Sequence, residues 1–242
     1  QQLASVQAGG VLRDLATAVG AVSLSELMRF ADPAEAAATL AVRDGERSAL
    51  GFYLDRQRVH VGDSGSLAQQ VLQAWVTDRQ QGRDSLMLAS TSKAVTELNA
   101  MARIHRLGDT DEGPRVMLRS GLHASAGDVI LTRRNDRRNR TSSTDWVKNG
   151  DRWLVQAVDA DGALRVIHLG SGKRARLGPD YVAGQVDLGY ASTIHSAQGV
   201  TTDTTHTLLS GLESRQLLYV AASRGRVSNH VYLSTSGDGD EH

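Results

Sequence analysis

The sequence predicts an α/β domain that is interrupted by a small β-barrel. Helical and strand-like segments alternate before about residue 113 and again after residue 187, which is typical of an α/β sheet. Between these points the chain changes to short β-branched segments separated by turns. With 40% hydrophobic and 22% charged residues, its 242 residues have an ordinary globular composition. We therefore expect three segments, at 1–112, 113–187 and 188–242.

The first segment is predicted to combine helices with two strands. Asp32-Pro33 has the composition of a helix start, because aspartate caps the first amides and proline suits the first helical position. The apolar run Ser85–Ala89 is typical of a buried parallel strand, and Thr91-Ser92 is able to cap the helix that follows. The expected elements are helices at 11–19, 26–30, 34–42, 66–81 and 93–106, with strands at 57–61 and 85–89.

The middle segment is predicted to consist of short strands. Asn149–Asp151 and Asp159–Gly162 have turn compositions between runs of β-branched or alternating apolar residues. The expected strands lie at 116–121, 128–134, 152–158, 164–169 and 186–192. After residue 187 we expect, in order, a strand, a helix after Thr193, a strand at 205–209, a helix at about 213–222 and a strand at 230–234.

The net charge of zero hides an uneven distribution. Residues 113–187 hold 13 Lys and Arg against 8 Asp and Glu, and the rest of the chain has the opposite excess. The arginines concentrate in TRRNDRRNRTSST at residues 132–144. This stretch is either a solvated loop or a nucleic-acid contact, since phosphates attract Arg and Lys through counterion release and Asn bonds to sugars or bases.

Composition excludes several kinds of site. The chain has no cysteine, which excludes disulfides, thiolate zinc ligands and a thiol nucleophile, and nothing else suggests a metal site. No N-terminal basic flank precedes an apolar run, and no run approaches the roughly 20 apolar residues that span a bilayer. We therefore expect a cytoplasmic protein without a membrane partner.

Two stretches near the C-terminal end carry the strongest signal. Residues 189–209, GYASTIHSAQGVTTDTTHTLL, contain the pattern x-T-x-H-x-x-Q-G, and LLYVAASRGRVSNHVYL follows at 217–233. Both stretches resemble the last two motifs of RecD-like superfamily 1 helicases. They are most similar to the bacterial MobF-type conjugative relaxases, the TraI, TrwC and TraA-like group. This resemblance implies a RecA-like domain of the P-loop NTPase type, with an inserted Src-homology-3-like barrel, that acts as the second motor domain of an ATP-dependent 5′–3′ DNA helicase.

Arg224 in the second motif is the candidate catalytic residue. The resemblance implies an arginine finger, which stabilises charge on a transferred γ-phosphoryl group. Small neighbours in AASRGR would let a helix pack closely and the guanidinium project across a cleft. Without the neighbouring pattern, a surface helix arginine paired with a carboxylate would be the simpler interpretation. Arg226 is the weaker candidate.

The first motif is assigned to both DNA and nucleotide. Thr193 and His195 are expected to begin a helix whose N-terminal amides can meet a DNA phosphate. His195 is expected to contact DNA or to couple the two sites, and not to act as a general base. Gln198 and Gly199 are expected to face the nucleotide, with the glycine allowing close approach.

Two further matches lie near the start of the chain. QQLASVQAGGVLRDLA resembles the sequence that follows the Gly-Asp of helicase motif III, and this resemblance places Gln2 near the γ-phosphate. The Gly-Asp itself is missing, so we expect a fragment that begins inside the motif. ELMRFADPAEAAATL resembles motif IV and assigns Arg29 to the γ-phosphate, with a solvated helix arginine as the alternative.

Other residues are candidates for DNA contact. By resemblance, Thr91 lies in a loop that holds the DNA backbone, although a plain helix cap is an equally good interpretation. Trp146 and Trp153 are able to stack on bases, but core packing is favoured in a chain with so few aromatic residues. Within the barrel the expected DNA-facing residues are Arg133, Arg134 and Asn135.

The sequence lacks an ATP-binding half. Gly170–Lys173 resembles the end of a P-loop, but Arg174 stands where Ser or Thr would hold magnesium and the first glycine is absent, so a hairpin turn is favoured. No acidic strand end suggests a Walker B motif. We expect ATP and Mg²⁺ to bind only in the intact protein, and the isolated chain not to hydrolyse ATP.

The expected partners are single-stranded DNA and the missing N-terminal motor domain of the same polypeptide. If the conjugative assignment holds, a relaxase domain would lie further upstream. Two alternatives remain open. One is a RecD-like helicase of recombination or repair, which would share these motifs, and the other is a non-catalytic nucleic-acid-binding module.

Overall fold

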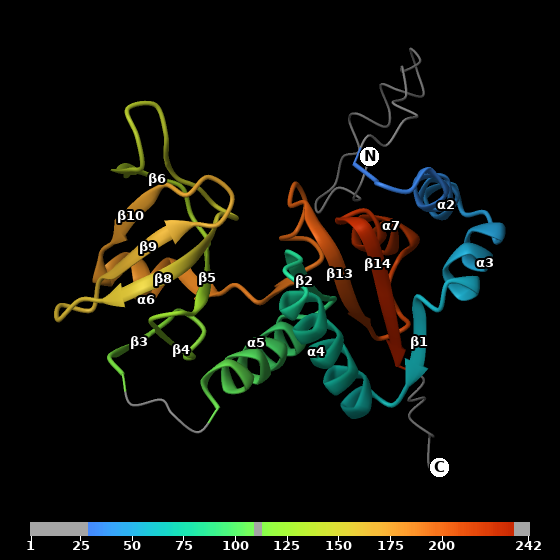
Figure 1. Ribbon diagram of the computed structural model, residues 1–242, viewed down its shortest axis with the longest axis horizontal. Coiled ribbons are helices and arrows are strands. Elements are labelled where there is room, and N and C mark those ends of the chain that lie inside the picture. Colours follow the sequence, from blue (N-terminus) through green and yellow to red (C-terminus); the bar gives the residue numbers. More distant parts are fainter. Residues whose placement is uncertain (1–28, 109–112, 235–242) are drawn as a thin grey trace, which may run out of the picture. The chain divides into compact units, whose positions relative to one another are not determined.

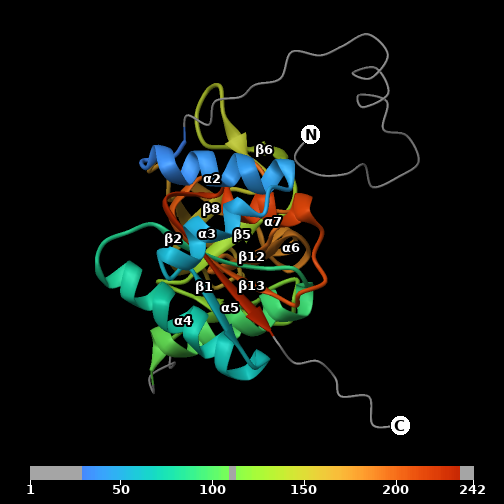
Figure 2. The same cartoon turned by 90° about the vertical axis from the view of Figure 1, so that its right-hand side faces the viewer.

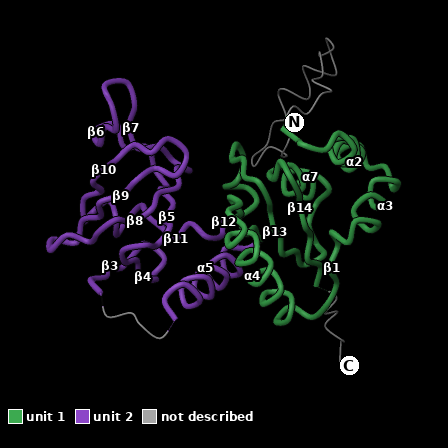
Figure 3. Tube along the Cα trace, viewed as in Figure 1, with its two compact units in different colours: residues 1–90, 193–242 green, residues 91–192 purple. Residues whose placement is uncertain are grey.

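The computed structural model describes residues 29–108 and 113–234, and Gln2 and the helix expected at 11–19 lie outside them. The chain divides into two compact units (Figure 3). Unit 1 combines residues 1–90 with 193–242, and unit 2 contains residues 91–192. The expected barrel segment, 113–187, lies within unit 2. Among the described residues, no helix is long and apolar enough to cross a membrane.

Unit 1 contains a parallel sheet, which confirms the α/β prediction (Figure 1). Its strands follow the order β1 (Val59–Gly62), β14 (Gly225–Ser234), β13 (Thr202–Leu209) and β2 (Ser85–Ala89). Every neighbouring pair in this series is parallel. β12 (Ala191–Thr193) carries the chain from unit 2 back into unit 1. A parallel sheet needs cover on both faces, and the helices of unit 1 provide it.

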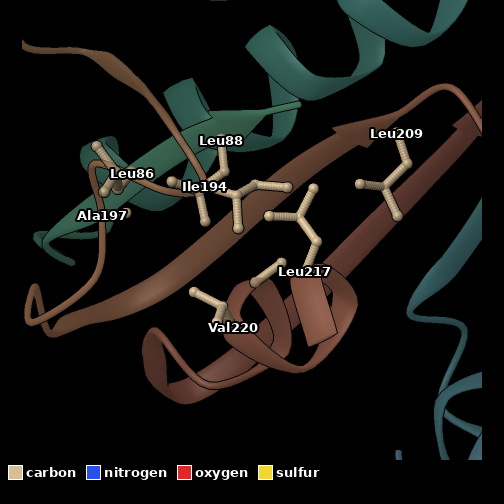
Figure 4. Packing of buried hydrophobic residues seen from close by; sticks show 8 residues of the cluster. Leu86, Leu88, Ile194, Ala197, Leu209, Leu217 and Val220 are labelled. Atoms are coloured by element: carbon tan, nitrogen blue, oxygen red, sulfur yellow. The ribbon is translucent and has the colours of Figure 1, made fainter. Parts of the chain in front are cut away.

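Helices α4 (Ser64–Gln80) and α7 (Arg215–Ala222) cover opposite faces of this sheet. Side chains alternate along β13, so Leu209 packs in the cluster with Leu217 of α7, whereas His206 bonds through Nε2 to Asp78 of α4 at 3.0 Å. The cluster on the α7 side comprises Leu86, Leu88, Ile194, Ala197, Leu209, Leu217, Val220 and Ala221 (Figure 4).

Two further helices pack beside α7, as the side view shows (Figure 2). α2 (Pro33–Asp44) begins as expected, because the Asp32 side chain accepts from the Ala34 amide at 2.8 Å. It ends at Gly45, whose φ of 81° suits glycine. α3 (Ser48–Asp55) was not expected, since Gly51 in its middle weakens the helical pattern.

Unit 2 is built on an antiparallel sheet that forms the predicted barrel. Its strand order is β10 (Arg174–Leu177), β9 (Leu164–His168), β8 (Arg152–Val158), β5 (Val129–Thr132) and β11 (Val186–Leu188). Two hairpins, β3 (Arg115–Met117) with β4 (His123–Ser125) and β6 (Asp136–Arg140) with β7 (Trp146–Val147), complete the strands. The unit also holds α5 (Ser92–Leu107) and α6 (Pro179–Gln185).

Several details of unit 2 differ from expectation. The strand expected at 186–192 is interrupted at Gly189, where an added Cβ would lie 2.8 Å from the Ile130 carbonyl carbon. The basic stretch forms strand β6, and α6 and β10 were not expected. Residues 136–140 of this stretch pair with β7 in a two-stranded sheet of their own, although their side chains resemble those of a loop.

The buried carboxylate of Asp128 joins α5 to the barrel. It accepts from Arg106 Nε at 2.8 Å and Arg103 Nε at 3.2 Å, both on α5. From the barrel side it accepts from the Ser125 amide at 2.8 Å and the Tyr190 hydroxyl at 2.6 Å. Asn99 of α5 adds bonds to the backbone of Tyr190 and Ala191, which explains why this helix belongs to unit 2.

Candidate functional site

Arg224 lies at the junction of α7 and β14. The helix ends at Ala222, as expected, so Arg224 lies two residues beyond it and not within a helical AASRGR stretch. The side chain is fully buried and turns back onto unit 1. Its Nε donates to the Val220 carbonyl at 2.9 Å, Nη2 to the Ser223 hydroxyl at 2.7 Å, and Nη1 to the Ala197 carbonyl at 3.4 Å.

The charge of Arg224 is not neutralised within the part of the chain that the structure describes. All three acceptors are neutral oxygens, and no described carboxylate forms an ion pair with this guanidinium. Burial lowers the pKa of Arg224 to about 10, with a smaller contribution from the positive charge of Arg29, so the side chain is still a cation at neutral pH. A buried cation without a carboxylate is suited to receive an anion.

Arg29 meets Arg224 at Ser223. Its Nη1 donates to the Ser223 carbonyl, while the hydroxyl of the same residue binds Arg224. Arg29 is partly buried, and burial lowers the pKa of its guanidinium. It lies in a turn and not in the helix expected at 26–30, of which residues 26–28 lie outside the described residues. The structure thus brings together two arginines that are 195 positions apart in sequence (224 minus 29).

The helix expected after Thr193 is a single turn at 194–199. The Thr193 hydroxyl accepts from the Ser196 amide at 3.1 Å, and its carbonyl accepts from the Ala197 amide at 3.0 Å. Gly199 ends the turn with a φ of 91°, which explains glycine there. The helix N-terminus expected to meet a DNA phosphate is therefore absent from this turn.

Some residues of this turn are exposed to solvent, and one contacts Arg224. His195, Gln198 and Gly199 are exposed, so they are accessible to a ligand. Ala197 is buried, and its carbonyl is the one that accepts from Arg224 Nη1. The backbone of the x-T-x-H-x-x-Q-G stretch thus connects directly to the candidate catalytic residue.

Thr91 caps α5. Its hydroxyl accepts from the Ala94 amide at 3.2 Å, and the residue is exposed. The cap interpretation is confirmed, and a DNA contact stays a prediction.

Two of the three expected DNA-facing residues of the barrel have structural partners instead. Arg133 Nε pairs with Asp187 at 2.7 Å, and the side-chain oxygen of Asn135 accepts from the Asn149 amide at 2.9 Å. Arg134 is exposed, and no described carboxylate pairs with its guanidinium. Only Arg134 therefore keeps a side chain that is free for a ligand.

The two tryptophans of the barrel differ in environment. Trp153 is 1% exposed and belongs to the core, as expected. Trp146 is only partly buried and lies under the guanidinium of Arg137, whose Cζ is 5.2 Å from the ring centroid. The sequence reasoning missed this pair, although Trp146 directly follows the basic stretch.

The P-loop-like stretch is a hairpin turn between β9 and β10, as expected. His168 Nδ1 accepts from the amides of Gly170 at 3.2 Å and Ser171 at 3.0 Å, and Lys173 pairs with Asp145 at 2.7 Å. Within the described ranges, no group of three or more His, Asp or Glu is arranged to hold a metal ion.

Two family models match the chain. One is described as an AAA domain and matches residues 1–64, and the other is the Rv2311 SH3-like barrel domain at residues 116–187. The chain is 38% identical over 136 residues to the uncharacterized protein Rv2311 of Mycobacterium tuberculosis, a match that covers 55% of this chain and 74% of that protein.

Conjugal transfer proteins are similar along nearly the whole chain. The TraA protein of Rhizobium radiobacter is 28% identical over 241 residues, which is 97% of this chain and 21% of TraA. The TraA protein of Agrobacterium fabrum is 28% identical over 238 residues and is covered to the same 21%. The chain thus spans about a fifth of these relatives.

Solved helicase structures share the fold. Bacteroides Pif1 bound to single-stranded DNA has a TM-score of 0.58 and 18% identity, over 88% of this chain and 51% of that chain. Pif1 helicase from Candida albicans has a TM-score of 0.54 and 14% identity, over 83% of this chain and 53% of its own. The RecA-like α/β domain with an SH3-like barrel is confirmed, and the chain spans about half of these helicases.

Proposed function

Because the chain belongs to the family of Rv2311 and carries a superfamily 1 helicase-type domain, we propose that it forms the second motor half of an ATP-dependent DNA helicase. A role in conjugation is suggested by its similarity to the TraA conjugal transfer proteins, and the 5′–3′ direction by its resemblance to RecD-like helicases; both are part of the proposal. A partner motor domain would contribute the P-loop.

The pairing of Arg29 and Arg224 is the observation that carries this proposal. Both guanidinium groups meet at Ser223, and no described carboxylate pairs with either of them. Two neighbouring cations without anions match what a γ-phosphate requires. The bond of Arg224 to the Ala197 carbonyl is the longest of its three, at 3.4 Å. A phosphate oxygen would replace this bond first.

This arrangement of side chains suits the phosphates of ATP but not a magnesium ion. The described residues offer guanidinium groups for the phosphate and no acidic cluster for magnesium. We therefore assign magnesium to the P-loop domain. Gln2, Gln198 and Gly199 remain proposed nucleotide contacts, and Thr91, Thr193 and His195 remain proposed contacts to single-stranded DNA.

The test is ATP hydrolysis by the chain joined to its P-loop domain. Arg224→Ala should lower kcat by about 10³-fold or more, because an arginine finger contributes on that scale. Arg226→Ala is the matched control, since Arg226 is mostly exposed and pairs with Asp203 at 2.5 Å. Wild-type hydrolysis by the Arg224→Ala protein, with a folded unit 1, would refute the assignment.

A further inference from the structure

The hairpin of β6 and β7 concentrates positive charge at one place in unit 2. Residues 133–148 contain six Arg and Lys against two Asp, and in Figure 1 the loop between the two strands projects from the barrel. The hairpin is anchored at its sides. Asn139 Nδ2 donates to the Arg176 carbonyl of β10 at 2.7 Å, and Asn135 holds the Asn149 amide at 2.9 Å.

Four arginines in or next to the hairpin lack a carboxylate partner among the residues that the structure describes: Arg140, which donates to the Ser143 carbonyl at 3.2 Å, and three others. Arg134, Arg137 and Arg138 are all exposed, and neither hairpin carboxylate pairs with them. Asp136 accepts from the Arg138 backbone amide at 3.1 Å. Asp145 uses one oxygen for Lys148 and the other for Lys173, each at 2.7 Å. The local acids are therefore already engaged, and the arginines are available to an external anion.

An aromatic ring lies among these cations. The chain has three tryptophans, of which Trp75 is 6% and Trp153 is 1% exposed, whereas Trp146 is only partly buried. Arg137 Cζ lies 5.2 Å from the Trp146 centroid and Lys148 Nζ lies 5.7 Å from it. A surface indole with cations at these distances offers stacking and charge together.

We propose that the β6–β7 hairpin is a binding site for unpaired nucleic acid, in which Trp146 stacks on a nucleobase and Arg134 and Arg138 contact the flanking phosphates. Every base has a face that can stack, but in a duplex those faces are covered, so the site selects single strands. Arg137 shares the indole and would pack beside the stacked base. An acidic peptide would satisfy the arginines but would not use the ring.

This inference deepens the proposed DNA binding and does not involve nucleotide. It can therefore be tested on the chain alone, whatever the outcome for Arg224. It also replaces Arg133 and Asn135, which are engaged within the barrel, by Arg138 and Trp146 as the residues that meet DNA.

Intrinsic fluorescence provides the assay, because the other two tryptophans are buried. An oligothymidylate added at low salt should quench the emission of Trp146 and saturate. Trp146→Leu should weaken binding about tenfold, measured by anisotropy of a labelled strand, since stacking contributes on that scale. Trp146→Phe should retain most of the affinity. The matched control is Arg165→Ala, because Arg165 is 62% exposed in the same unit and already pairs with Asp159.

An abasic strand of equal length separates stacking from charge. It keeps the phosphates, so it should bind more weakly than the oligothymidylate and leave the Trp146 emission nearly unchanged. Equal quenching by the abasic strand, by duplex DNA or by polyglutamate would overturn the proposal. So would unchanged affinity in Trp146→Leu, provided that its melting curve matches the wild type.

Discussion

Replacing Asp128 by alanine should detach α5 from the barrel of unit 2. The fully buried carboxylate accepts from two arginines of α5, from the amide and hydroxyl of Ser125, and from the Tyr190 hydroxyl at 2.6 Å. Its removal leaves two partly buried guanidinium groups without their carboxylate. Breaking a buried ion pair from one side costs about 3–5 kcal/mol. For a unit of this size, about 3 kcal/mol corresponds to a fall in Tm of roughly 12–24 °C.

Urea unfolding followed by far-ultraviolet circular dichroism would measure this loss. Tyr190→Phe is the graded comparison, because it removes one hydrogen bond to a charged group and should cost about 1.5–3 kcal/mol. Asp128→Asn should fall between the two, since it keeps one acceptor oxygen and loses the charge. A loss below about 1 kcal/mol in Asp128→Ala would show that α5 is held by other contacts.

Three further predictions concern stability. Burial, with smaller contributions from His206 and His60, lowers the pKa of His230 from 6.5 to about 3. Between these two values the imidazole is protonated in the unfolded chain and neutral in the folded chain. The contribution of His230 should be fully present above about pH 6.5 and fall by about 1.4 kcal/mol per pH unit on acidification toward pH 3. Chemical denaturation should find a smaller slope in His230→Phe. Thr91→Ala should lower the free energy of unfolding by about 1 kcal/mol through loss of the α5 cap, and Thr91→Ser should restore most of it in the same urea titration. Gly199→Ala places a side chain at a φ of 91° and should cost about 1 kcal/mol in thermal melts, with Gln198→Ala, an exposed neighbour in the same turn, as the control.

The elements that the sequence predicted well depend on local rules. The cap of α2 at Asp32 and the cap of α5 at Thr91 follow from neighbouring residues alone. α3 was not predicted, because Gly51 interrupts the helical pattern of a segment that is nevertheless helical. Trp153 and Val155 lie on the same, buried side of β8, because side chains alternate along a strand. Strand periodicity alone therefore indicates the core position of Trp153.

The candidate site depended more on distant partners. The engagement of Arg133 was not predictable, because Asp187 lies 54 residues away in sequence. The meeting of Arg29 with Ser223 across 194 positions was expected only through resemblance to helicase motifs. The burial of Arg224 against the Ala197 carbonyl depends on how the chain turns after α7 ends at Ala222, and the sequence does not indicate the direction of that turn.

In the sequence, unit 2 lies between strands β2 and β13 of unit 1, and this has a consequence for the order of folding. Ser85 on β2 and Thr204 on β13 share a side-chain hydrogen bond at 2.9 Å although they are 119 positions apart. During synthesis, β2 therefore leaves the ribosome long before its neighbour exists, whereas unit 2 is one continuous segment and is able to fold first. A compact insert brings its two ends together and so shortens the loop that the sheet has to close. Mutations that slow barrel formation should thus delay assembly of the parallel sheet, even where they leave its final stability unchanged.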